Sequence, residues 1–161
     1  MKLMNSELTY VGSVSLMLKN GNNILRKMYY NNGTNELFEA YARALSGQPI
    51  QSFIPSYIEI VKDNKSIVKH LIPVTTTYVA PDTPDKAPCT RVSALINRHM
   101  FDDITGESHY LRLLSFGENE LAKVRLVGFN EILKGLSPGV QIMISWDLYI
   151  QNKPGGNGGN E

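Results

Sequence analysis

Residues 24–48 read ILRKMYYNNGTNELFEAYARALSGQ, a stretch in which a strand pattern turns into a helix pattern within four residues. Before the junction at Asn31–Thr34, the residues are mostly bulky apolar or aromatic, as is typical of a strand. After it, apolar residues recur at spacings of three and four, which places them on one helix face: Leu37, Phe38, Tyr41, Ala42 and Leu45. The stretch therefore predicts a strand joined directly to a helix whose apolar face packs on a sheet.

The helix carries local signals at both ends. The junction Asn31–Thr34 contains Asn, Gly and Thr, all of which are good N-cap residues. Glu36 lies in the first turn, where the helix dipole favours an acidic side chain. Arg43 lies near the other end, and Gly47 is suited to the left-handed position that follows many helices. These signals predict a helix over about 34–46.

The rest of the chain alternates apolar and polar residues with a period of two, which is the pattern of half-buried strands. Asn20-Gly21 is a strong hairpin signal between the first two strands. The predicted strands are 8–19, 24–30, 56–62, 66–73, 74–80, 89–101, 109–117, 122–130 and 139–152. With turns every 8–12 residues, this pattern predicts a mainly β fold, an antiparallel β-sandwich or barrel-like domain with one helix packed on the sheet.

The composition favours one domain without a cofactor. A chain of 161 residues with 16 basic and 15 acidic side chains has a net charge of +1, which does not favour nucleic-acid binding. We expect a single β-sandwich-like domain over 1–151 and a flexible tail rich in Gly and Asn over 152–161. Neither a secretory signal nor an apolar run of about 18 residues is present, so we expect no membrane association.

Catalytic and metal-binding patterns are weak. Three histidines, His70, His99 and His109, lie in predicted strands without the spacing of metal ligands, and we expect half-exposed strand residues. A cupin-like metalloprotein would require all three to converge. Cys89 is the one cysteine of the sequence, so an internal disulfide is excluded. We interpret it as a small apolar residue at a strand start rather than a nucleophile. We therefore predict no enzymatic activity and no catalytic or metal site.

One loop and several aromatic residues allow other interpretations. The segment 102–108 contains three carboxylates but is typical of a hairpin turn rather than a calcium loop. Tyr29 and Tyr30 point to opposite faces of their strand, so they do not form a base-stacking platform. Exposed tyrosines would instead indicate a carbohydrate- or protein-binding module, and the candidates are Tyr57, Tyr78 and Tyr110. Trp146 is expected in the core or at an interface.

Two segments resemble structural proteins of tailed bacteriophages, especially gut phages of the crAss-like kind. Residues 20–47 contain a hairpin that leads through an N-x-G-T junction into a helix of the form LF…A…ALSG. Residues 124–129 and 139–152 are similar to the closing part of such proteins, where W-x-L-x-x-x-N ends the domain.

The resemblance implies a non-enzymatic virion protein assembled in the host bacterial cytoplasm. An auxiliary protein that decorates the capsid is the leading interpretation, and a neck, ring or tail component is the alternative. The implied partners are the major capsid protein or neck and tail proteins, together with further copies of the chain. Contacts are expected in the loop 81–88, the turn 102–108 and the tail. The candidate residues are Asp82, Asp85, Lys86, Asp102, Asp103, Glu107, Lys153 and Asn157.

Overall fold

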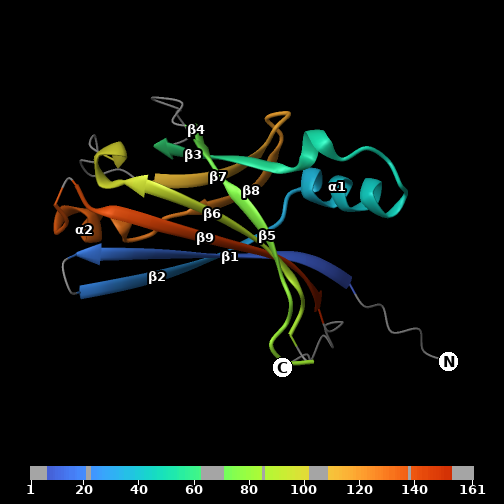
Figure 1. Ribbon diagram of the computed structural model, residues 1–161, viewed down its shortest axis with the longest axis horizontal. Coiled ribbons are helices and arrows are strands. Elements are labelled where there is room, and N and C mark those ends of the chain that lie inside the picture. The colour runs from blue at the N-terminus through green and yellow to red at the C-terminus, as the bar shows by residue number, and fades with distance from the viewer. Residues whose placement is uncertain are drawn as a thin grey trace, which may run out of the picture.

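Two antiparallel sheets enclose the core in the computed structural model, which describes residues 7–20, 23–62, 71–84, 86–101, 109–137 and 139–153. Figure 1 shows the sheets as two layers, with the main helix α1 at one end of the sandwich. The prediction of a mainly β, sandwich-like domain with one main helix is therefore confirmed.

The larger sheet has five strands and the smaller sheet has four. The order in the larger sheet is β2 (Asn23–Asn32), β1 (Glu7–Asn20), β9 (Gln141–Lys153), β6 (Cys89–Asn97) and β5 (Thr75–Val79). The order in the smaller sheet is β4 (Leu71–Pro73), β3 (Pro55–Lys62), β7 (His109–Ser115) and β8 (Glu120–Arg125). β1 and β9 are the longest strands, and they pair from Glu7–Lys153 to Leu18–Ile142 in the middle of the larger sheet.

The two sheets are connected along both sides. On one side the chain passes from β4 into β5 through Val74, whose N–H donates to the carbonyl of Ser56 at 3.1 Å. On the other side Gly33, just after β2, forms an antiparallel bridge with Ala122 of β8. These crossings make the sandwich a flattened barrel.

The middle of the chain forms a Greek key. β3, β4 with β5, and β6 follow one another as antiparallel neighbours, and β7 returns to lie beside β3. Counted within the motif, β7 is the fourth strand and lies beside the first strand, β3. This is the arrangement that defines a Greek key. It brings β6 and β7, which are consecutive in the chain, into different sheets.

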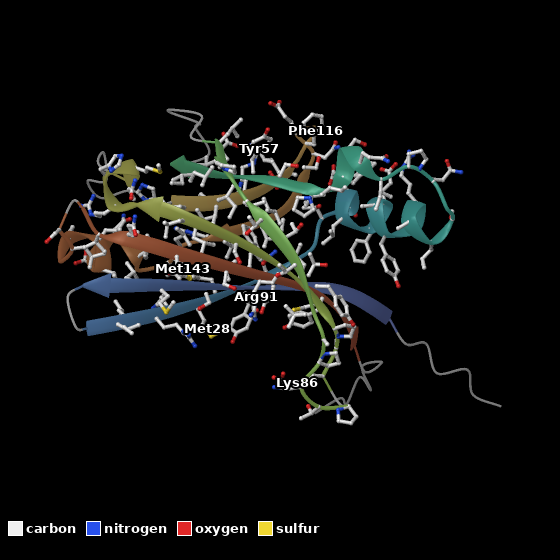
Figure 2. All side chains as sticks on the ribbon, in the orientation of Figure 1. Met28, Tyr57, Lys86, Arg91, Phe116 and Met143 are labelled. Carbon is white, nitrogen blue, oxygen red and sulfur yellow. The ribbon has the colours of Figure 1, made fainter. Side chains whose placement is uncertain are left out.

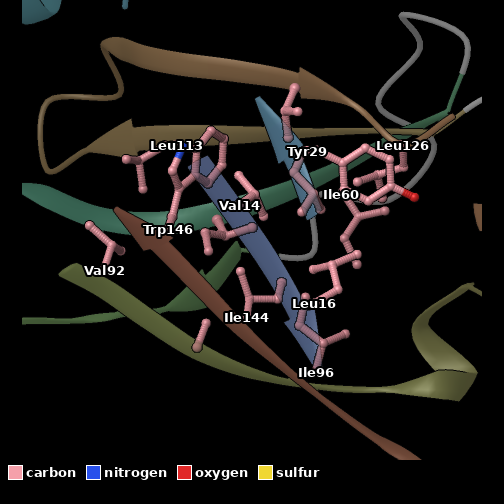
Figure 3. Close-up of a cluster of buried hydrophobic side chains, with 14 of the residues drawn as sticks. Val14, Leu16, Tyr29, Ile60, Val92, Ile96, Leu113, Leu126, Ile144 and Trp146 are labelled. Carbon is pink, nitrogen blue, oxygen red and sulfur yellow. The ribbon is translucent and has the colours of Figure 1, made fainter. Parts of the chain in front are cut away.

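The core lies between the sheets and follows the predicted alternation. Val14, Leu16 and Leu18 of β1 are buried, and in register they lie opposite Trp146, Ile144 and Ile142 of β9. Figure 3 shows several of these side chains with residues of the smaller sheet, including Ile60 and Leu113. Trp146 was expected in the core or at an interface, and because it has no exposed surface it lies in the core.

The predicted helix is present as α1 (Asn35–Leu45). The hydroxyl of Thr34 accepts a hydrogen bond from the N–H of Leu37 at 3.3 Å, so Thr34 is the N-cap among the residues that the junction offers. Leu37 joins the core, and the helix lies against β8 and the short 3-10 helix η1 (Gln51–Phe53). The Arg43 guanidinium lies 5.5 Å from the centre of the Phe53 ring.

Two predicted strands end earlier than expected. The strand predicted over 122–130 stops at Arg125, and a short helix α2 (Phe129–Lys134) follows a left-handed Gly128 with φ of 71°. Phe129 and Leu133 are both buried, and their spacing of four residues suits a helix rather than a strand. The strand predicted over 89–101 stops at Asn97 and continues as a 3-10 helix, η2 (Arg98–Phe101).

Candidate interaction surfaces

The five-stranded sheet has an outer face, which we define as its side away from the four-stranded sheet. The strand register places Met17 of β1, Met143 of β9 and Leu95 of β6 next to one another across three strands. Met143 and Leu95 are about half exposed. Figure 2 shows Met28 and Met143 on this side of the molecule, and Tyr57 and Phe116 on the opposite side. The outer face therefore presents a row of flexible apolar side chains.

Polar side chains border this apolar row. Ser15, Ser145 and Ser93 form the next row across the same three strands. Beyond it, the Arg91 guanidinium binds the Asp147 carboxylate through two hydrogen bonds of 2.8 and 2.9 Å. The hydrogen bond and charge of Asp147 raise the pKa of Arg91, so the guanidinium keeps its charge. The outer face therefore combines an apolar row with a fixed ion pair.

The edge strand β2 continues the outer face. Its outward side chains include Ile24, Met28 and Tyr30, all of which are exposed. Arg26 lies between Ile24 and Met28, opposite Met17. The next residue, Lys27, points to the other face, where its Nζ atom lies 6.0 Å from the centre of the Tyr29 ring. This edge therefore combines apolar, aromatic and cationic side chains.

The junction after β2 fixes the edge strand to the smaller sheet. The Thr34 hydroxyl lies 2.6 and 2.9 Å from the carbonyl oxygens of Glu120 and Leu121. Tyr29 reaches the same side of the molecule, where its hydroxyl donates to the carbonyl of Val127 at 3.1 Å. Burial raises the pKa of Tyr29 to about 12, so the phenol remains a neutral donor. The segment between strand and helix is thus a structural joint that holds β2 in place.

An ion-pair network on the four-stranded sheet was not found by sequence reasoning. The Arg112 guanidinium lies 2.7 Å from Glu59 and 2.6 Å from Glu120, and Glu59 is only 2% exposed. Burial lowers the pKa of Arg112, but hydrogen bonds and charges from Glu120 and Glu59 outweigh it and raise the pKa overall. One guanidinium is thus shared by two carboxylates and links strands β3, β7 and β8.

The predicted contact residues fall only partly within the described chain. Asp82 and Lys86 are exposed in the loop between β5 and β6, with Nζ and Oδ2 3.8 Å apart. Lys153 is the last residue of β9 and pairs with Glu7 of β1, so the strand extends two residues into the predicted tail. The other candidates lie outside the described residues: Asp85, Asp102, Asp103, Glu107 and Asn157.

The histidines differ from the prediction of half-exposed strand residues. His109 is buried, with its Nδ1 atom 2.9 Å from Oδ1 of Asn130 in α2. His99 is exposed but lies in η2 rather than in a strand, and His70 lies outside the described residues. Within the described ranges, no three side chains of the kinds that bind metal lie together.

The remaining candidates do not assemble into a site either. Burial raises the pKa of the Cys89 thiol, and the nearby Asp147 adds to this effect, so the protonated form is favoured. Tyr57 and Tyr110 lie on the four-stranded sheet, whereas Tyr78 lies on β5 of the other sheet. The Tyr110 ring has the Nζ atom of Lys123 4.6 Å from its centre. The three tyrosines therefore do not share one platform.

Comparisons with known proteins give no match, whether with family models, curated proteins or solved structures. Among the described residues, no helix is both long and apolar enough to cross a membrane.

Proposed function

We propose that the chain is a non-enzymatic structural protein of a tailed-bacteriophage virion, where it decorates the capsid as an auxiliary protein. The observation that carries the proposal is the outer face of the five-stranded sheet, with half-exposed Met143 and Leu95 beside Met17. Exposed apolar side chains gathered on a flat surface are typical of protein–protein contact sites. Methionine adds to this, because its flexible side chain adapts to a partner surface.

The resemblance of residues 20–47, 124–129 and 139–152 to phage structural proteins supports the same proposal. In this proposal the partner of the outer face is the major capsid protein. The ion pair Arg91–Asp147 lies beyond the serine row on the same face and would orient the contact. A neck, ring or tail position remains the variant of the proposal, with a different partner on the same face.

Mass spectrometry of gradient-purified particles from the source culture tests the proposal. The copy number is measured against that of the major shell protein. Hundreds of copies per particle support capsid decoration, whereas about a dozen support a neck or tail position. Absence of the chain from clean particles overturns the virion proposal.

A matched pair of variants tests the outer face itself. Met143→Lys places a charge in the apolar row, so we expect it to reduce incorporation into particles. Phe116→Lys is the control, because Phe116 is also a large exposed apolar residue but lies on the opposite side of the molecule (Figure 2). Equal incorporation of both variants would contradict the assignment of the outer face.

A further inference from the structure

The helix α1 carries an apolar stripe that the sheets cover only in part. Leu37 is 9% exposed and joins the core, as expected of a helix that packs on a sheet. Phe38 and Tyr41 are 40% and 39% exposed, and Leu45 is 73% exposed. Figure 1 shows α1 at one end of the sandwich and the start of β2 at the other end. The single chain therefore leaves a large part of this stripe in contact with water.

The spacing of the exposed residues determines what kind of partner the stripe fits. Phe38, Tyr41 and Leu45 follow one another at intervals of three and four residues, which is the pattern of a helix that packs on another helix. Small residues border them, with Ala42 on one side and Ala44 on the other. Small side chains at the border of a contact let the axes of two helices approach closely. The stripe is therefore suited to a second helix.

The charged side chains of α1 lie on the other side of the helix. At about 100° per residue, Glu36, Glu39 and Arg43 fall within one sector opposite the stripe. The Arg43 guanidinium donates to Oε1 of Glu39 at 2.9 and 3.0 Å, and it lies near the Phe53 ring of η1. A second α1 can therefore approach the stripe without placing like charges opposite each other.

We propose that α1 pairs antiparallel with α1 of a second copy, about a two-fold axis between Tyr41 and Ala42. Phe38 and Leu45 lie equally far before and after this point, so Phe38 of each copy faces Leu45 of the other. Tyr41 meets its counterpart on one flank of the contact, and Ala42 meets its counterpart on the other flank. The stripe thus complements itself, because each large apolar side chain gains an apolar neighbour.

The antiparallel direction follows from the end of the helix that is fixed to the sheet. At the helix start, the Thr34 hydroxyl lies 2.6 Å from the carbonyl oxygen of Glu120 in β8. At the other end, Leu45 is exposed. Parallel helices would bring the two sandwiches together at the same end, whereas antiparallel helices place them at opposite ends of the pair. The antiparallel arrangement also sets the positive end of each helix dipole beside the negative end of the other.

The result is an isologous dimer held by one pair of helices. Each helix has 11 residues and is about 16 Å long, so the pair buries less than the roughly 1,200 Å² of a stable interface. We therefore expect a weak dimer that forms at high concentration. The inference concerns the free chain in solution and does not depend on the virion proposal, which uses the outer face of the five-stranded sheet. A dimer without a place in the particle, or a particle protein that is monomeric when free, would separate the two.

Sedimentation equilibrium over a dilution series tests the dimer. The wild-type chain is expected to approach twice its 18.0 kDa mass at about 1 mM and to dissociate on dilution. Leu45→Lys puts a charge into both of the pairs that Leu45 forms with Phe38, so the dimer should weaken about tenfold or more. Ile24→Lys is the matched control, because its side chain is an isomer of leucine and is 65% exposed against 73% for Leu45. It lies at the end of β2 that is far from α1, so its dimer should persist.

Disulfide cross-linking tests the register. In a Cys89→Ser background, Ala42→Cys should form a cross-linked dimer under mild oxidation, because the two copies of residue 42 meet at the axis, within the reach of a disulfide. Ala44→Cys is the matched control, since it changes the same residue type on the same helix and Ala44 is exposed as well. Its counterpart lies further along the helix pair and away from the line of contact, so no specific cross-link is expected.

A wild-type chain that stays monomeric at about 1 mM overturns the proposal. A dimer that Leu45→Lys leaves intact also overturns it, since the interface must then lie elsewhere. Cross-linking of Ala44→Cys as fast as Ala42→Cys would contradict the register. If the free chain is monomeric and Leu45→Lys still reduces incorporation into particles, the stripe binds another protein and not a second copy.

Discussion

The indole Nε1 of Trp146 donates a hydrogen bond to Oδ1 of Asn31 at 3.2 Å, although the two residues are 115 positions apart in the chain. Gly12 of β1 lies opposite Asn31 of β2 on one side and opposite Leu148 of β9, two residues after Trp146, on the other. The bond therefore spans three strands at the point where β2 turns towards the smaller sheet. It satisfies the polar atom of the largest buried side chain and fixes the start of the junction before the helix.

We expect Asn31→Ala to lower the free energy of unfolding by about 1–3 kcal/mol, because the buried indole N–H of Trp146 loses its acceptor. Chemical denaturation followed by tryptophan fluorescence measures the change, since the chain has one tryptophan. In the matched control, Asn32→Ala changes the adjacent residue of β2 instead. A loss for Asn32→Ala as large as for Asn31→Ala would show that the indole bond is not the cause.

Gly12→Ala tests the close approach between the same strands. A Cβ atom at Gly12 would overlap Oδ1 of Asn31 and lie 2.9 Å from Nε1 of Trp146. We expect a loss of about 1–3 kcal/mol from the forced displacement. In a Gly12→Ala/Asn31→Ala double variant the first overlap is relieved, so its cost should be smaller than the sum of the single costs. Strict additivity in a double-mutant cycle would contradict the overlap.

The raised pKa of Tyr29 leads us to expect a loss of folding stability at alkaline pH. Its pKa is raised from 10.0 to about 12 by burial, so the folded chain retains the phenol proton after the unfolded chain has lost it. Stability from this group is complete below pH 10 and falls as the pH rises from about 10 to about 12. Thermal unfolding between pH 9 and 12 should show a steeper fall for the wild type than for Tyr29→Phe. Tyr30→Phe, which changes an exposed neighbour, should keep the wild-type slope.

Local patterns predicted most of the strands and the main helix, but not which strands lie next to each other. The alternation of Val14, Leu16 and Leu18 against Ser13 and Ser15 predicts which side of β1 is buried, because burial follows the strand period directly. The junction Asn31–Thr34 likewise predicts the helix start, because capping depends on residues within one turn, although it does not single out Thr34. These features require no knowledge of the rest of the fold.

Features that depend on register between distant strands were not predictable. Arg112 meets Glu59, 53 residues away, only because β3 and β7 pair in the register that aligns them. The helix α2 was missed because six residues with two buried positions, Phe129 and Leu133, are too short to display a helical period. The burial of His109 depends on Asn130 of that same helix. The place of β2 at the end of its sheet, beside β8, is set by sheet order, which local patterns do not encode.

Replacing Arg112 should lower the free energy of unfolding more than replacing Arg91. Arg112→Met leaves the buried Glu59 carboxylate without this cation, and Glu120 loses the same partner. Removing one partner of a buried ion pair costs about 3–5 kcal/mol. The matched control is Arg91→Met, which breaks the bidentate pair with Asp147 on the more exposed outer face and should cost at most about 1 kcal/mol. Chemical denaturation of both variants measures the difference, and equal losses would show that the burial of Glu59 does not set the cost.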